Sequence, residues 1–269
     1  TFDVLCNYFG TPGPVGADMR VWATRLFEFQ FADQAGDPAL RVDVDRFAPL
    51  LREHVDGLIE QRKGAPKVDD LLGRCLELQA AGTPGMDSAT IRTNLVGLIV
   101  GGLPQPPLVL PQAMEQLLRR PAVLEEATAA ARAGDDARLG ALVFEALRFD
   151  PLAPALVRIA AEDYVVAAGT WRARRIARGA TVFAAVRSAM HDGRRVPHPG
   201  RFDAGRPAYQ YMHFGYGMHS CFFMHVNSML LPLILKPLLA CGNVRRAEGA
   251  EGSLSKRGIF PERLVVRFG

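Results

Sequence analysis

The feature that most constrains the fold is the loss of helical patterning at Asp150-Pro151. Before this point, apolar residues recur at helical spacing in segments separated by short polar, Gly or Pro breaks. The expected helices cover 18–32, 43–62, 67–81, 87–101, 112–119, 121–133 and 135–148, and Asp87 is a plausible N-cap. After Pro151, short β-branched runs at 156–160, 164–167 and 180–184 predict strands. The pattern predicts a mainly α fold with small β-sheets.

A long segment without strong periodicity, 191–220, follows these strands and is rich in Gly, Pro, His and aromatic residues. A loop of this length inside a compact domain is usually functional. An apolar helix-like segment over 222–241 comes next, and strand-like pieces near 243–247 and 263–268 end the chain. Because no linker or repeat separates these parts, we expect residues 1–269 to form a single domain. Its helical part covers 1–150, and 151–269 holds the strands, the loop and the final helix.

The charge distribution argues against nucleic-acid binding. The net charge is only +4, and the one dense basic run, Arg172–Arg178, lies between two strand-like segments beside a single aromatic residue, Trp171. A nucleic-acid site would need a concentrated basic face with stacking aromatic residues. We therefore expect a solvated hairpin at this run.

Cysteine spacing and proline content indicate a cytoplasmic protein without a stable membrane span. The four cysteines are scattered without paired spacing, which fits a reducing compartment; they are Cys6, Cys75, Cys221 and Cys241. The most apolar stretches, 94–111 and 226–241, are interrupted by prolines and do not favour a membrane span.

The strongest local motif is Phe214-Gly215-Tyr216-Gly217-Met218-His219-Ser220-Cys221. Its two glycines permit backbone turns that a Cβ atom would forbid. Cys221 comes just before an apolar helix, so we expect its sulfur near a helix N-terminus, where N–H groups and the macrodipole favour a thiolate. Such a thiolate is a soft ligand for haem iron and favours O–O bond cleavage.

Two other interpretations of this motif stay open. A glycine-rich turn can simply carry a buried cysteine. His219, Cys221 and His225 also form a His-x-Cys-x3-His cluster that zinc could use. A structural zinc ion takes four ligands, however, and the sequence has no second ligand pair with finger-like spacing.

A second motif, Glu145-Ala146-Leu147-Arg148, places opposite charges on one face of a helix. Its position gives it weight, since the pair ends the helical half and is followed by strands, the long loop and then Cys221. In this order the motifs resemble the cytochrome P450 superfamily. Glu145 and Arg148 resemble the family's Glu-x-x-Arg pair, and 214–221 matches its Phe-Gly-x-Gly-x-His-x-Cys segment at every defined position.

The resemblance implies an N-terminally truncated cytochrome P450-like fold and the cofactor heme b (iron protoporphyrin IX). It also implies that Thr1–Pro14 corresponds to a stretch well inside the family's usual domain. Cys221 would be the metal ligand. The other implied cofactor-side residues are Phe214 and Gly215 in the loop, Arg158 and His219 at the propionates, and Glu145, Arg148 and Arg201 in a buried charge network. The implied distal residues are Gly101, Gly102 and Gln105.

The expected distal helix departs from the family's pattern. The family usually places an acidic residue beside a threonine there, to relay protons, whereas 101–107 contains neither a carboxylate nor a hydroxyl. Gln105 is the one polar distal side chain, and three prolines surround it. Because an interior proline costs about 3 kcal/mol, a continuous helix through 103–108 is not expected. Phe223 also stands where the family has glycine.

The resemblance therefore implies a haem-thiolate oxidoreductase with an organic or lipid substrate, and three functions stay open. A monooxygenase would receive electrons from a ferredoxin and a reductase. A fatty-acid hydroperoxide isomerase or dehydratase would need no electron donor and could be fused to a peroxidase or dioxygenase domain. A non-catalytic partner domain would neither use electrons from a reductase nor convert a hydroperoxide.

Overall fold

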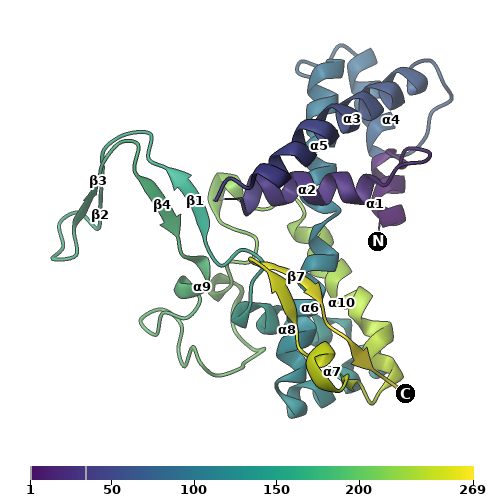
Figure 1. Ribbon diagram of the computed structural model, residues 1–269. Helices are drawn as coiled ribbons and strands as arrows, with labels where there is room; N and C mark the ends of the chain where they lie inside the picture. The colour runs from purple at the N-terminus through teal and green to yellow at the C-terminus, as the bar shows by residue number, and fades with distance from the viewer. Residues whose placement is uncertain (1, 34) are drawn as a thin grey trace. The chain divides into compact units, whose positions relative to one another are not determined.

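The computed structural model describes residues 2–33 and 35–269. The chain forms two compact units, Thr1–Pro107 and Leu108–Gly269, called here the N-terminal and C-terminal units. The described residues are mostly helical and contain four small sheets of two strands each (Figure 1). The predicted fold class, mainly α with small β-sheets, is confirmed. The single-domain organisation stays a prediction.

Helices make up the N-terminal unit. They are α1 (Phe2–Phe9), α2 (Met19–Phe31), α3 (Pro38–Arg62), α4 (Leu71–Ala80) and α5 (Ser88–Gly102). Helix α3 packs against both α2 and α5. Its buried residues Leu51, Val55 and Ile59 recur every four positions, so they form one apolar stripe on the helix.

Aspartates begin four of these helices. Asp18, Asp37, Asp70 and Asp87 each accept a backbone N–H from the first turn of the helix that follows. Such an N-cap stabilises a helix by about 1 kcal/mol. The predicted role of Asp87 is confirmed. Helix α3 begins at Pro38 rather than at 43, because Asp37 caps it and Pro38 needs no N–H donor in the first turn.

The apolar stretch after α5 is broken at Leu103 and Pro104, and α6 (Gln105–Leu118) begins directly after the break. The prediction that no continuous helix crosses 103–108 is confirmed. The predicted start at 112 is wrong, however, because Pro106 and Pro107 lie in the first turn of α6. Backbone N–H groups have no helical partner there, so proline is tolerated.

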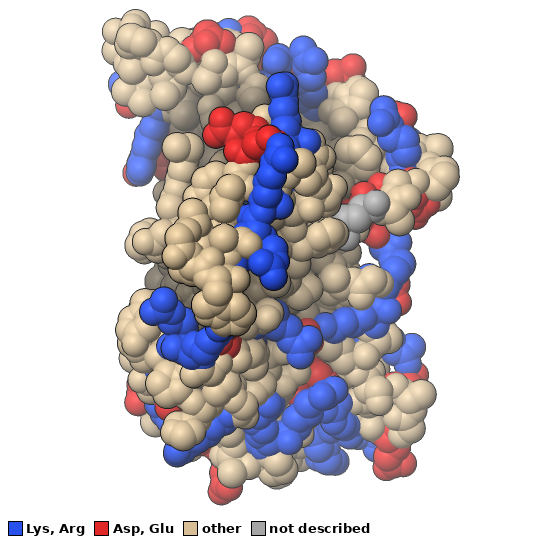
Figure 2. Space-filling view, turned by 90° about the vertical axis from the view of Figure 1, so that its left-hand side faces the viewer, with Lys and Arg blue, Asp and Glu red and all other residues tan. Residues whose placement is uncertain are grey.

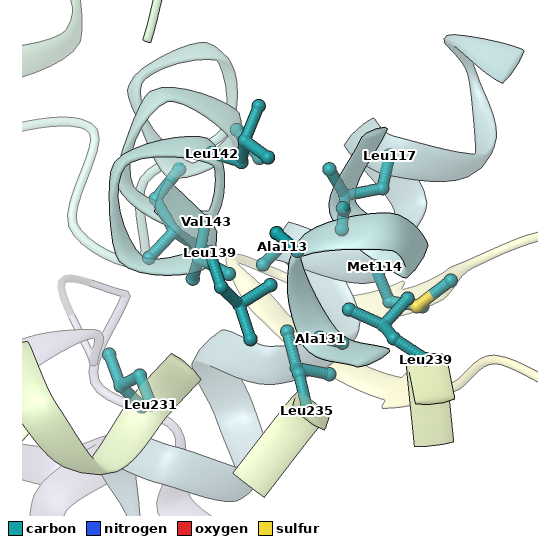
Figure 3. Close-up of a cluster of buried hydrophobic side chains, with 14 of the residues drawn as sticks. Ala113, Met114, Leu117, Ala131, Leu139, Leu142, Val143, Leu231, Leu235 and Leu239 are labelled. Carbon is teal, nitrogen blue, oxygen red and sulfur yellow. The ribbon is translucent and has the colours of Figure 1, made fainter. Parts of the chain in front are cut away.

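The core of the C-terminal unit lies among α6, α7 (Pro121–Ala133), α8 (Asp136–Phe149) and α10 (Met224–Cys241). Helix α10 packs on α7 and α8, which also pack on each other. Its contribution is Leu231, Leu235 and Leu239, one residue per turn (Figure 3). These leucines belong to one buried cluster with side chains of α6 and α8, including Leu117 and Leu142. Each fully buried leucine stabilises the fold by roughly 1.5–3 kcal/mol.

The strands form antiparallel pairs. Strand β1 (Leu156–Ile159) pairs with β4 (Thr181–Ala184), β2 (Tyr164–Val166) with β3 (Arg174–Ile176), β5 (Arg245–Arg246) with β8 (Val266–Arg267), and β6 (Ser255–Arg257) with β7 (Phe260–Arg263). A short helix, α9 (Val186–Ala189), follows β4. The predicted strands at 156–160, 164–167 and 180–184 are confirmed.

The hairpin of β2 and β3 carries the basic run Arg172–Arg178. Its arginines are exposed, and Arg175 pairs with Asp163. Figure 2 faces the side that carries this hairpin in Figure 1 and shows Lys and Arg side chains at the surface. The predicted solvated hairpin is confirmed.

Two apolar helical stretches, Ser88–Leu118 and Met224–Cys241, have the length and composition of a membrane span. Half of an 18-residue window in the first stretch and 28% of the second stretch are buried inside the protein. Core helices of soluble proteins meet the same two criteria, so this finding carries little weight. That the protein lacks a stable span stays a prediction.

Candidate functional site

Cys221 ends a closed loop that starts at Phe214. The backbone N–H of Cys221 donates to the carbonyl oxygen of Phe214 at 2.7 Å. Gly215 has a φ of +71°, and a Cβ atom there would lie 3.1 Å from the carbonyl oxygen of His219. Both the left-handed backbone and the close approach require glycine at this position. The loop therefore holds Cys221 at a defined place before α10.

The thiol of Cys221 is half-buried. Burial raises its pKa, while the backbone N–H of Phe223 acts in the opposite direction with a smaller effect. The expectation that a helix N-terminus favours a thiolate is wrong for the bare loop. Helix α10 starts only at Met224, and the effect of the helix dipole is confined to the first turn. A thiol of this kind loses its proton when it coordinates a metal ion.

The chemistry of the donor set fits haem and does not fit zinc. In residues 2–33 and 35–269, no three His, Cys, Asp or Glu side chains are grouped to hold a metal ion. Haem iron needs a single thiolate from the protein. Large apolar side chains around Cys221 are exposed, with Tyr216, Met218 and Phe222 at 89%, 98% and 77%. Such a surface suits a flat apolar macrocycle.

Arg158 and His219 are the predicted propionate partners. Arg158 lies in β1, and its Nη1 donates to the carbonyl oxygen of Val157 at 2.8 Å. His219 lies in the loop itself. Both side chains are exposed, and neither forms an ion pair with a carboxylate of the described residues. Both are therefore available to an anionic ligand group, and their role stays a prediction.

Glu145 and Arg148 form a fully buried ion pair on α8, with both side chains 0% exposed. Arg148 Nε donates to Glu145 Oε2 at 3.0 Å, and Nη2 donates to Oε1 at 2.9 Å. The remaining guanidinium N–H groups reach the carbonyl oxygens of Met190 and Arg201 at 3.0 and 3.1 Å. The pair thus ties α8 to the long segment that leads to Cys221.

Arg206, rather than Arg201, supplies the second guanidinium of this network. Arg206 Nε donates to Glu145 Oε1 at 3.3 Å, and its side chain is 3% exposed. The Arg201 side chain is exposed, so its predicted place in the network is wrong. A turn closed by the hydrogen bond from Arg201 N to His198 O lets Arg201 contribute only its carbonyl oxygen, which accepts from Arg148 and Arg206. Both arginines occur in one loop, and spacing alone does not select between them.

Two aromatic residues of the long loop, Tyr211 and His213, adjoin the same network. The Tyr211 hydroxyl donates to Glu145 Oε2 at 3.0 Å, and burial together with the Glu145 charge raises the pKa of Tyr211. His213 Nε2 donates to the carbonyl oxygen of Phe144 at 2.9 Å, and its ring stacks on Tyr211. Burial lowers the pKa of His213 to about 4, so the ring is neutral near pH 7.

Phe214 extends this cluster to the loop, since its ring lies 5.7 Å from that of Phe144 on α8. Phe223, which stands at the family's glycine position, is only 5% exposed, whereas Phe222 is the exposed ring. The large side chain of Phe223 is therefore buried inside the protein.

The predicted distal residues belong to the end of α5 and the start of α6. Gly101 and Gly102 form the last turn of α5, and Gln105 is the first residue of α6. Apart from its own helix backbone and chain neighbours, no atom of the described residues lies within 4 Å of the place that a Cβ would take on Gly101. Their role stays a prediction.

No family model matches the chain. It is 27% identical over 235 residues to cytochrome P450-SOY of Streptomyces griseus, a match that covers 87% of this chain and 52% of that protein. It is also 27% identical over 207 residues to 20-oxo-5-O-mycaminosyltylactone 23-monooxygenase of Streptomyces fradiae, covering 77% and 46%. The chain therefore spans about half the length of these curated relatives.

A shorter match relates the chain to the bifunctional dioxygenase–epoxy alcohol synthase of Fusarium oxysporum, with 33% identity over 78 residues, or 29% of this chain and 6% of that protein. Among solved structures, ligand-free cytochrome P450 TbtJ1 superposes with a TM-score of 0.79 at 26% identity. That superposition covers 99% of this chain and 68% of the solved one. The likeness therefore extends through nearly the whole chain.

Proposed function

Because the chain belongs to the cytochrome P450 superfamily, we propose that the protein is a haem-thiolate oxidoreductase acting on an organic or lipid substrate. The observation that carries this proposal is the closed loop in which Cys221 N–H bonds to Phe214 O and Gly215 takes a left-handed backbone conformation, with only 3.1 Å between the place of a Cβ and the carbonyl oxygen of His219. This loop offers one soft donor, the Cys221 sulfur, which would bind the iron.

Each side chain of the site has a defined task under this proposal. A thiolate-bound haem supplies the cleavage of an O–O bond and the oxidation of the substrate. Cys221 would hold the iron, Arg158 would offer positive charge to the propionates, and His219 would offer them a ring N–H donor. Glu145, Arg148, Arg206 and Tyr211 do no chemistry, because all four side chains are engaged in a network that supports the Cys221 loop.

We place monooxygenation first among the possible reactions. One relative that matches most of the chain is named a monooxygenase. This activity would require a ferredoxin and a reductase as electron donors. The four cysteines are free, which fits the reducing cytoplasm in which we expect the protein to act.

The distal segment favours a second candidate, a peroxide-dependent reaction such as the isomerisation or dehydration of a fatty-acid hydroperoxide. Residues 101–107 have no carboxylate or hydroxyl side chain to deliver protons. A hydroperoxide already contains the reduced O–O bond, so its conversion does not require protons to be delivered to dioxygen. The local match to a dioxygenase–epoxy alcohol synthase also supports a peroxide-dependent reaction. A dioxygenase domain fused to this chain would support it further. Gln105 would then bind a peroxide oxygen.

The absorption spectrum of the reduced protein under carbon monoxide tests the proposal. We expect a red-shifted Soret band that is lost in Cys221→Ser and kept in Cys241→Ser, since Cys241 is an exposed thiol at the end of α10. A protein that binds no haem, or a band that survives in Cys221→Ser, would contradict the proposal. The first result would leave a non-catalytic partner domain.

Two assays then separate the reactions. A monooxygenase should consume NAD(P)H when ferredoxin and reductase are added. A hydroperoxide isomerase or dehydratase should convert lipid hydroperoxide without any electron donor.

A further inference from the structure

The C-terminal unit contains a cavity of about 240 Å³ that the proposed haem chemistry does not use. Its lining includes Glu115 and Arg119 of α6, Asp150 at the end of α8, Arg187 of α9 and Lys256 of β6. None of its lining residues belongs to the loop 214–221. Charged side chains from four separate elements therefore surround one space.

The two carboxylates at this cavity are already neutralised. The Glu115 side chain is 5% exposed, and its oxygens accept from Arg119 Nε at 2.7 Å and from Arg246 at 2.6 and 2.9 Å. Both oxygens of Asp150 accept from Lys256 Nζ at 2.8 and 2.7 Å. These contacts orient the basic groups and leave no uncompensated negative charge at the cavity.

Hydrogen-bond donors remain available there. The Arg187 side chain is exposed and forms no hydrogen bond or ion pair within the part of the chain that the structure describes. Arg119 uses its Nε on Glu115, and its Nη atoms have no hydrogen bond to any described residue. Lys256 keeps one ammonium N–H beyond the two that Asp150 takes. The cavity thus combines surplus positive charge with donors from three elements.

We propose that this cavity binds a phosphate group, either as free phosphate or as a phosphate monoester. A tetrahedral dianion has oxygens in several directions and can meet Arg119, Arg187 and Lys256 together, whereas a planar carboxylate has only two oxygens. Guanidinium groups are well matched to phosphate, because their parallel N–H groups can donate to two oxygens at once. Arg187 is the main ligand, since no protein carboxylate competes for it.

Calorimetric titration of the whole chain with inorganic phosphate, at constant ionic strength, tests this site. We expect saturable binding that weakens at least tenfold in Arg187→Ala and recovers in part in Arg187→Lys. Arg178→Ala is the matched control, because Arg178 is also exposed and lacks an ion pair among the described residues, but does not line the cavity. This control should bind phosphate like the unmodified protein. Thermal denaturation would verify that all variants are folded.

Three outcomes would overturn the assignment. One is the absence of saturable phosphate binding. Another is an equal loss of affinity in Arg178→Ala and Arg187→Ala, which would show that phosphate binding depends on the net positive charge of the protein and not on this cavity. The third is acetate binding as tight as phosphate binding. Glycerol phosphate as a parallel probe separates the two sources: tighter binding than inorganic phosphate assigns the site to a monoester, and weaker binding assigns it to the free ion.

Discussion

Arg206 and Glu145 form an ion pair with 3.3 Å between Nε and Oε1, although 61 residues separate them in the sequence. Arg206 also donates to the carbonyl oxygens of Pro197, His198 and Arg201. One side chain therefore joins α8 to the turn of the long loop before Cys221. The exposed Arg201 side chain takes no part in this connection.

We predict that Arg206→Ala destabilises the protein by roughly 1–3 kcal/mol, because it removes one of the two arginine partners of the buried Glu145 and leaves the Pro197 carbonyl oxygen without its donor. Arg201→Ala should change the free energy of unfolding by less than about 0.5 kcal/mol, as surface substitutions usually do. Urea denaturation of both variants measures the difference. Equal losses would show that the network does not depend on Arg206.

The neutral ring of His213 predicts a dependence of stability on pH. Burial lowers its folded-state pKa to about 4, whereas an unfolded histidine titrates near 6.5. Between these values the unfolded chain binds a proton that the folded protein excludes. The stabilisation is therefore complete above pH of about 6.5 and is lost as the pH falls to about 4, at no more than about 1.4 kcal/mol per pH unit.

His213→Gln tests this origin, since glutamine keeps an N–H donor for the Phe144 carbonyl oxygen but does not titrate. We expect a flatter stability profile between pH 4 and 6.5 for this variant. His225→Gln, at an exposed position of α10, should keep the original slope. If both variants show the unmodified slope, another group is responsible.

Gly215→Ala should distort the Cys221 loop. Alanine in the left-handed region costs roughly 1–2 kcal/mol, and its Cβ would press on the carbonyl oxygen of His219. We expect a lower haem content per protein chain together with a lower unfolding midpoint. Gly200→Ala is the control, because a Cβ there meets no atom within 4 Å. Haem content that is unchanged in Gly215→Ala would contradict the role of this loop.

The core cluster predicts a contrast between two leucines of α10. Leu239 is 0% exposed and Leu233 is 39% exposed. Leu239→Ala should therefore lower the free energy of unfolding by about 2–5 kcal/mol through lost burial and the cavity that remains. Leu233→Ala should cost less than about 1 kcal/mol. Chemical denaturation distinguishes them, and similar costs would contradict the surface position of Leu233.

The sequence by itself determined the features that depend on near neighbours. Apolar periodicity before Asp150 predicts the helices, and Asp87 caps a helix because its side chain reaches an N–H three residues away. Leu103-Pro104 interrupts the apolar stretch for an equally local reason, the missing proline N–H. The order of the Glu145–Arg148 pair and the Cys221 motif likewise indicated the family, since it is a property of the chain itself.

Only the tertiary structure decided which distant groups meet. Arg201 and Arg206 are equivalent by residue type and lie in one loop, and the turn closed by Arg201 N–H and His198 O determines which guanidinium reaches Glu145. Tyr211 joins that carboxylate from 66 residues away, a contact that no periodicity encodes. The raised pKa of Cys221 has the same origin, because burial is set by the packing of the whole unit and not by the motif around the thiol.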